Sequence, residues 1–294
     1  MLKWIGKNLS EENILPSIVY GLLAAIGWGA GDFTGGLAAR KTGALRGVFY
    51  GEIIGLIAVV AISLMDNQPV PALKVWVLTT IAGAVGTMGL ILLYHAMTTG
   101  LMSVATPVSA LLAAVLPVIF GAFMEGLPSP CTFVGFAFAL AAVWMISQGE
   151  GGVTNILAHI SDLKLPLLAG VGFGLYFVLM NLATQNTSLF WPMVGSRTGG
   201  LLILIVFMLI RREPLTVTQG AWGFIFLNGM LDIAGNGFFI LAGQTGRLDV
   251  SAVLSALYPG GTVLLAWIFL RERLSRNQWL GILLALASII LLTV

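Results

Sequence analysis

Long apolar runs follow one another along almost the whole chain, and charged residues or Pro/Gly-rich turns end each of them. Because a bilayer core of about 30 Å requires roughly 20 apolar residues per helix, runs of this length predict transmembrane helices. A more polar stretch near 149–165 separates two sets of five. The first set is expected near 17–37, 47–65, 74–97, 101–124 and 130–148. The second set is expected near 166–184, 191–210, 219–243, 248–270 and 277–294.

The composition indicates a surface that faces lipid. Of the 294 residues, 58% are hydrophobic and 9% are charged, whereas a soluble domain carries roughly 25% charged residues. A net charge of +2 without a basic cluster argues against nucleic acid as a partner. The single cysteine, Cys131, excludes an internal disulfide and a structural zinc site. We therefore expect an all-α, multi-pass integral membrane protein of a bacterial or archaeal inner membrane, without a cofactor.

The first 16 residues form a separate N-terminal segment. Its lysines, Lys3 and Lys7, are followed by Glu11 and Glu12 before the first apolar run, which is the wrong order for a signal peptide. A short helix in the membrane interface and an untethered leader are both open. We divide the chain into this leader (1–16), a first five-helix repeat (17–148), a linker (149–165) and a second, inverted five-helix repeat (166–294).

An internal repeat relates the two sets of helices. A shift of 146 positions brings the third expected helix onto the eighth. The aligned residues include Gly83 with Gly229, Gly89 with Gly235, Thr99-Gly100 with Thr245-Gly246, and Ser109-Ala110-Leu111 with Ser255-Ala256-Leu257. This many identities in one register indicate a duplicated five-helix unit. Because five is odd, the second copy is expected to lie upside down in the membrane.

Basic residues in the loops agree with this inversion. Loops after the odd-numbered helices hold nine: Arg40, Lys41, Arg46, Lys164, Arg211, Arg212, Arg271, Arg273 and Arg276. The other side holds four: Lys3, Lys7, Lys74 and Arg247. The positive-inside rule makes the richer side cytoplasmic, which places both termini outside.

Three groups of residues resemble a known family. They are Trp28-Gly29 with Gly31-Asp32-Phe33; Tyr94-His95-Ala96 with Gly100 and Ser103-Val104-Ala105-Thr106-Pro107; and Leu257-Tyr258-Pro259 with Arg271-Glu272-Arg273-Leu274-Ser275, Gln278 and Gly281. Together they resemble the drug/metabolite transporter superfamily, specifically its EamA-type members, over nearly the whole chain. The resemblance implies ten helices in a 5+5 inverted repeat around a central cavity, and export or exchange of metabolites.

The chain departs from that family in two respects. Leu112 stands where the second copy has Pro259. The family is usually drawn with both termini in the cytoplasm, which is opposite to the result of the loop charges. The sidedness of the protein therefore stays open.

Two opposite charges occupy pseudo-equivalent positions in the second and seventh expected helices. Glu52 lies inside Gly51-x-x-x-Gly55 and Arg197 inside Ser196-x-x-x-Gly200, 145 positions apart. A charge at the bilayer centre costs about 2.5–3.5 kcal/mol on insertion scales, so such residues are usually paired or functional. One interpretation is a charge pair beside the cavity that a substrate or a proton breaks. The other is that each side chain snorkels to the headgroups.

Asp32 lies midway along the first expected helix among several glycines. A carboxyl group inside a membrane can bind and release a proton during transport, so Asp32 is a candidate for proton or substrate coupling. Asp232 in the eighth helix is a second candidate. For both, the alternative is a position close to water. His95 is a further candidate because imidazole exchanges protons readily, and a structural histidine at a helix interface is its alternative.

Glycine-rich helices predict the solute site, because irregular backbone at membrane depth is tolerated where it lines a cavity. The first, third, sixth and eighth expected helices have this character. The candidate substrate-binding residues on or beside them are Trp28, Tyr94, His95, Tyr176, Asn181, Asn236 and Tyr258. An aromatic side chain among glycines can equally serve packing alone.

The predicted function is secondary-active transport of a small organic metabolite such as an amino acid, by export or exchange, with protons as candidate coupling ions. The alternatives are export of drugs or lipophilic cations, transport of a sugar or nucleotide-sugar, and a membrane-embedded enzyme. Catalysis is not expected, since no Gly-x-Ser-x-Gly or His-Glu-x-x-His motif occurs. The expected partners are the solute, protons and the lipid bilayer, with the protein as a monomer or a weak homodimer.

Overall fold

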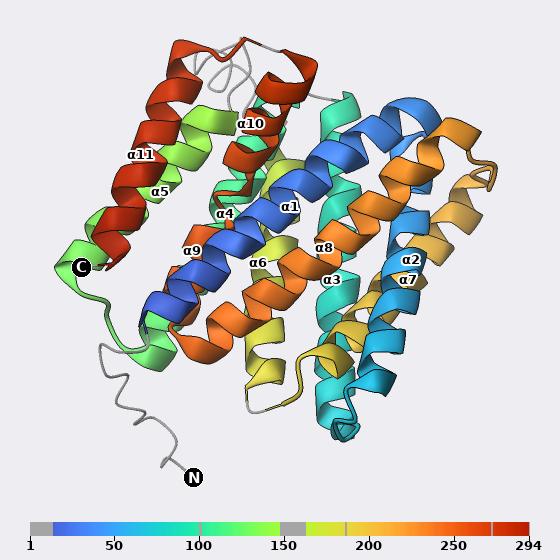
Figure 1. Ribbon diagram of the computed structural model, residues 1–294, viewed down its shortest axis with the longest axis horizontal. Helices are drawn as coiled ribbons and strands as arrows, with labels where there is room; N and C mark the ends of the chain where they lie inside the picture. The colour runs from blue at the N-terminus through green and yellow to red at the C-terminus, as the bar shows by residue number, and fades with distance from the viewer. Residues whose placement is uncertain (1–13, 100–101, 148–162, 186, 272, 294) are drawn as a thin grey trace.

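The computed structural model describes residues 14–99, 102–147, 163–185, 187–271 and 273–293. The helices form one bundle (Figure 1). The first half contains α1 (Ile14–Thr42), α2 (Ala44–Met65), α3 (Leu73–Thr99), α4 (Met102–Glu125) and α5 (Pro130–Ser147). The second half contains α6 (Lys164–Thr184), α7 (Phe190–Arg211), the 3₁₀ turn η4 (Gln219–Ala221), α8 (Trp222–Thr245), α9 (Leu248–Ser255), α10 (Tyr258–Leu270) and α11 (Arg276–Thr293).

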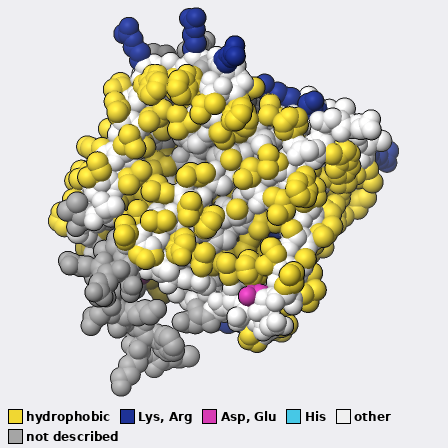
Figure 2. All heavy atoms as spheres, in the orientation of Figure 1, with side chains coloured by type: hydrophobic (Ala, Val, Ile, Leu, Met, Phe, Trp, Pro, Cys, Tyr) yellow, Lys and Arg dark blue, Asp and Glu magenta, His cyan; other side chains and the backbone are white. Residues whose placement is uncertain are grey.

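Most of these helices can cross a membrane. Within the described residues, nine stretches are long and apolar enough, with α9 and α10 counted together as Leu248–Leu270. α1 has 29 residues, but five glycines between positions 27 and 36 dilute its apolar character. Apolar side chains cover the face of the bundle shown in Figure 2. The predicted all-α membrane fold is confirmed.

Two expected helices differ from the structure. The helix expected at 248–270 is divided into α9 and α10, which end and begin on either side of Ala256 and Leu257. Pro259 explains the break, because proline has no N–H to donate and its ring collides with the carbonyl group four residues earlier. The helix expected at 17–37 extends to Thr42, and the positive charges of Arg40 and Lys41 suit the end of a helix.

The main packed pairs of helices follow the internal repeat: when each helix is replaced by its counterpart in the other half, another packed pair results. α1 packs along α8, and α6 packs along α3 in the same way. α2 packs against its own counterpart α7, and α5 against α11. Gly27 lies against the backbone of Gly235 at the α1–α8 crossing, and Gly172 against Gly89 at the α6–α3 crossing. The glycines that the 146-residue shift aligned therefore occupy equivalent crossings, as a two-repeat architecture requires.

Basic side chains gather at one end of the bundle, which we call the basic end. It holds the last residues of α1, α7 and α10 and the first residues of α2, α6 and α11. Lys and Arg side chains line the upper edge of the molecule in Figure 2. Here the start of α2 is tied to the α7–α8 loop, since Arg46 Nη1 donates to Thr216 O at 2.8 Å and the Tyr50 hydroxyl donates to Leu215 O at 2.7 Å. We call the other end, where α4, α6 and α8 finish, the opposite end.

Candidate functional site

Arg197 on α7 forms the centre of a buried charge cluster. Its Nη1 lies 2.7 Å from Glu52 Oε1 on α2, and its Nη2 pairs with Asp232 Oδ2 on α8. The Arg197 side chain is only 7% exposed, so its charge is held inside the bundle and does not reach the headgroups. Gly55 of α2 lies beside the guanidinium group, and a Cβ at this position would be in van der Waals contact with the guanidinium carbon at 3.5 Å.

The charge cluster continues along α8 to α6. Asn236 Nδ2 donates to the backbone oxygen of Asp232 at 2.7 Å and to its carboxylate at 3.1 Å. The Tyr176 hydroxyl on α6 donates to Asn236 Oδ1. Five side chains from four helices are thus joined, and we call them the polar network: Glu52, Tyr176, Arg197, Asp232 and Asn236. All five were candidates from the sequence, and the structure brings them together.

Tyr176→Phe tests the outermost link of this network. Loss of the hydroxyl removes one hydrogen bond to Asn236 and is expected to lower the free energy of unfolding by about 0.5–1.5 kcal/mol. The measurement is the thermal unfolding midpoint of purified protein in detergent. Tyr20→Phe is the control, because the Tyr20 ring stacks on Phe238 and no described residue accepts a hydrogen bond from its hydroxyl. Equal midpoints for the two variants would contradict the prediction.

Asp32 lies close to the polar network but outside it. It follows Trp28 by four residues on α1, so the two side chains share one face of the helix. The residue lies deep among the atoms of the bundle, yet its side chain is exposed. Its carboxyl group is near enough to Asp232 for the two to repel each other. Among the described residues no hydrogen bond or ion pair engages it, which places Asp32 at an accessible position in the interior.

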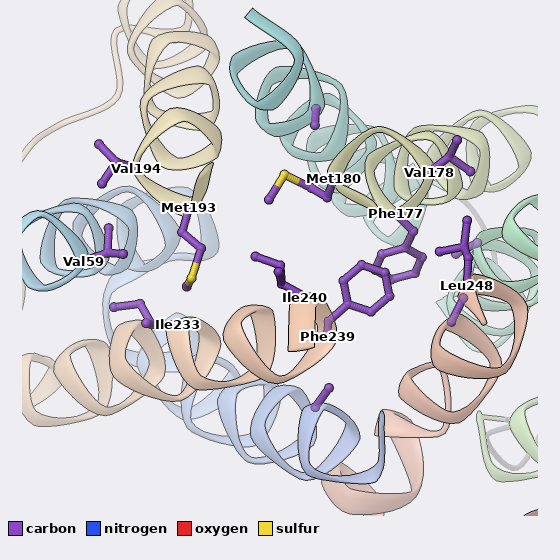
Figure 3. Close-up of a cluster of buried hydrophobic side chains, with 14 residues drawn as sticks. Val59, Phe177, Val178, Met180, Met193, Val194, Ile233, Phe239, Ile240 and Leu248 are labelled. Carbon is purple, nitrogen blue, oxygen red and sulfur yellow. The ribbon is translucent and has the colours of Figure 1, made fainter. Parts of the chain in front are cut away.

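Three aromatic rings from three helices lie next to the network. The Trp28 ring centre is 5.5 Å from that of Phe177 on α6 and 5.8 Å from that of Phe239 on α8. The two phenylalanine rings are 4.7 Å apart and lie side by side in Figure 3. We call Trp28, Phe177 and Phe239 the aromatic layer. Neither phenylalanine was among the candidates from the sequence, although Phe239 follows Asn236 by three residues and so lies on the same face of α8.

The other candidate residues lie elsewhere. Asn181 accepts a hydrogen bond from Gln185 Nε2 at 3.1 Å near the end of α6 and lies against Gly243, outside the polar network. Tyr258 begins α10 at the helix break, where its carbonyl oxygen approaches Gly29 of α1. His95 is exposed near the last turn of α3. The side chain of Tyr94 lies outside the described residues.

Comparison with known proteins gives the family. The model of the EamA-like transporter family matches residues 15–148 and again residues 162–294. An uncharacterised protein of Methanocaldococcus jannaschii is 28% identical over 131 residues, which are 44% of this chain and 94% of that protein. One protein of known crystal structure has the same fold, with a TM-score of 0.77 at 19% identity over 94% of this chain and 95% of its own. Since the family model matches both halves, the chain belongs to the EamA-like transporter family.

Proposed function

We propose that the protein is a secondary-active transporter that exports or exchanges a small organic metabolite, such as an amino acid, by alternating access coupled to protons. The observation that carries this proposal is the position of Asp32, a carboxyl group inside the bundle that is exposed and engaged by no ion pair among the described residues. Such a group is costly to insert, and no ion pair or hydrogen bond with the described residues offsets that cost, so a role in binding explains its presence.

Competition at Asp32 supplies a mechanism for coupling. The ionised carboxyl group repels Asp232, and either a proton or the amino group of a solute would remove that repulsion. Because one carboxyl group cannot hold both ligands, proton binding would release the solute and solute binding would release the proton. Trp28, on the same face of α1, would contact the apolar part of the solute. The carboxylate of an amino acid would compete with Glu52 for Arg197.

Export of lipophilic cations is a second candidate, which the balance of charge favours. Three carboxyl groups, those of Asp32, Glu52 and Asp232, lie close together with one guanidinium group, that of Arg197. This arrangement leaves an excess of negative charge beside the aromatic rings of Trp28 and Phe177. Aromatic rings and carboxylates together attract organic cations.

Flux into proteoliposomes under an imposed proton gradient distinguishes these candidates. Purified protein would be tested with labelled amino acids, sugars and lipophilic cations, one class at a time. Gradient-dependent flux of amino acids supports the first proposal, and flux of cations alone supports the second. Absence of flux for every class, with folded protein verified, would contradict both.

Asp32→Asn is expected to reduce gradient-dependent flux at least about tenfold, which corresponds to roughly 1.4 kcal/mol. The amide keeps the size of the side chain but cannot take up the proton or carry the negative charge. Asp66→Asn is the matched control, because Asp66 is exposed beyond the end of α2. Full gradient-driven flux in both Asp32→Asn and Glu52→Gln would disprove proton coupling through these groups.

A further inference from the structure

We infer that the structure is a state closed at the opposite end and open toward the basic end, with a gate made of the aromatic layer and three amide side chains: Asn181, Gln185 and Gln244. The inference rests on the proposed alternating access and identifies the groups that must separate during it.

Contacts among α6, α8 and α9 close the opposite end of the bundle. α6 contacts both α8 and α9. Asn181 of α6 lies against Gly243 of α8, close to the last turn of each helix. A solute that leaves toward this end would require these helices to separate.

The three amide side chains join α6 to α8. Gln244 Nε2 donates to the backbone oxygen of Thr184 at 2.7 Å, and Gln185 Nε2 donates to that of Gly243 at 3.2 Å. Gly243 has no side chain, and a Cβ there would collide with Asn181 Oδ1. The bonds to backbone oxygens are specific yet individually modest, about 0.5–1.5 kcal/mol each, so the contact can break during a transport cycle.

The junction of α8 and α9 adds a second contact at the same end. Arg247 Nη2 donates to the backbone oxygen of Gly126 at 2.7 Å and to Asp249 Oδ2 at 2.7 Å. The Asp249 side chain is fully buried, and Leu248 N donates to the Glu125 carboxylate at 3.3 Å. The last turn of α4 is thereby held to the first turn of α9. At a shift of 146, the repeat counterparts of Arg247 and Asp249 are Leu101 and Ser103. Only the second half therefore carries charged residues at these two positions.

The polar network is accessible on the other side of the aromatic layer. Along α8, from the basic end to the opposite end, Asp232, Asn236, Phe239 and Gly243 follow one face in that order. The Asp232 side chain is 35% exposed, whereas Phe239 is 1% exposed. Asp32 is exposed in the half of α1 that leads to the basic end. We therefore infer that water reaches the charged groups from the basic end and is stopped by the aromatic rings.

Cysteine labelling tests the closed end without any need for transport. In a Cys131→Ser background, Asp32→Cys would be treated in proteoliposomes with a membrane-impermeant maleimide from either side. Arg212→Cys and Gln68→Cys, which are exposed at the basic and opposite ends, identify the two sides. We expect Asp32→Cys to react from the side of Arg212 and to be protected from the side of Gln68. Reaction only from the side of Gln68 would overturn the inference.

A disulfide across the gate tests its movement. In the double variant Asn181→Cys, Gly243→Cys, a disulfide would join α6 to α8 where these two residues are in contact. Oxidation is expected to abolish flux and reduction to restore it, while labelling of Asp32→Cys from the basic end stays unchanged. Undiminished flux in the oxidised protein would overturn the gate.

Gln244→Leu provides a test that needs no disulfide. It removes both hydrogen bonds that Gln244 donates to the end of α6 and is expected to raise labelling of Asp32→Cys from the opposite end several-fold. An unchanged labelling rate would count against the amide contact as a gate. If the wild-type protein moved no solute while the labelling followed expectation, the proposed function would fail and the closed end would stand.

Discussion

Arg197→Ala is expected to destabilise the protein more than any other substitution in the polar network. It leaves Glu52 and Asp232 facing each other inside the bundle without the guanidinium group that now binds both. Removal of one partner from a buried ion pair typically costs about 3–5 kcal/mol. The lower part of that range applies here, because the Glu52 and Asp232 side chains are 18% and 35% exposed. The measurement is the yield of monodisperse protein and its thermal unfolding midpoint in detergent.

A variant that lacks all three charges of the cluster separates the electrostatic contribution from that of packing. The triple variant Arg197→Gln, Glu52→Gln, Asp232→Asn keeps polar side chains of similar size but no charge, and should recover most of the midpoint lost by Arg197→Ala. Arg197→Lys should recover only part of it, since one ammonium group cannot match two carboxylates as a guanidinium fork does. A midpoint of Arg197→Ala equal to that of the wild type would contradict the buried charge cluster.

The contact between Glu52 and Arg197 illustrates how much the sequence can predict. Their pseudo-equivalent positions in the two halves made a pair plausible, because equivalent helices of an inverted repeat, here α2 and α7, meet each other. Asp232 was also a candidate, but no spacing along the chain links it to Arg197. That contact depends on how α8 packs against both α2 and α7, which apolar patterning does not specify.

The helices themselves were predicted better than the site. Apolar runs of the required length identify a membrane helix whatever its neighbours are, because lipid replaces tertiary contacts as the surroundings. The break in the helix expected at 248–270 was missed, although Pro259 signals it, since the run stays apolar across Leu257. The amide side chains of Gln185 and Gln244 were missed because each bonds to a backbone oxygen, and backbone acceptors leave no trace in a sequence.

Gly83→Ala is the second substitution with a large expected effect. Gly83 on α3 lies directly on the carbonyl group of Ser196 on α7, and Gly199 on α7 lies on that of Thr80 on α3. A Cβ at position 83 would overlap the Ser196 oxygen, and no side-chain rotation can relieve a clash with backbone. Overpacking usually costs about 1–3 kcal/mol and occasionally more. We expect the upper part of this range, measured as a lower unfolding midpoint in detergent.

The glycines of this chain supply their own control for that experiment. Gly36 on α1 has open space where its Cβ would lie, with no neighbour within 4 Å. Gly36→Ala should therefore leave the midpoint unchanged or raise it, by up to about 1 kcal/mol from helix propensity alone. Because Ser196 immediately precedes Arg197, displacement of α7 by Gly83→Ala should also weaken the ion pairs to Glu52 and Asp232. Flux should then fall in Gly83→Ala and persist in Gly36→Ala, and equal midpoints for the two variants would show that α3 and α7 are not in backbone contact.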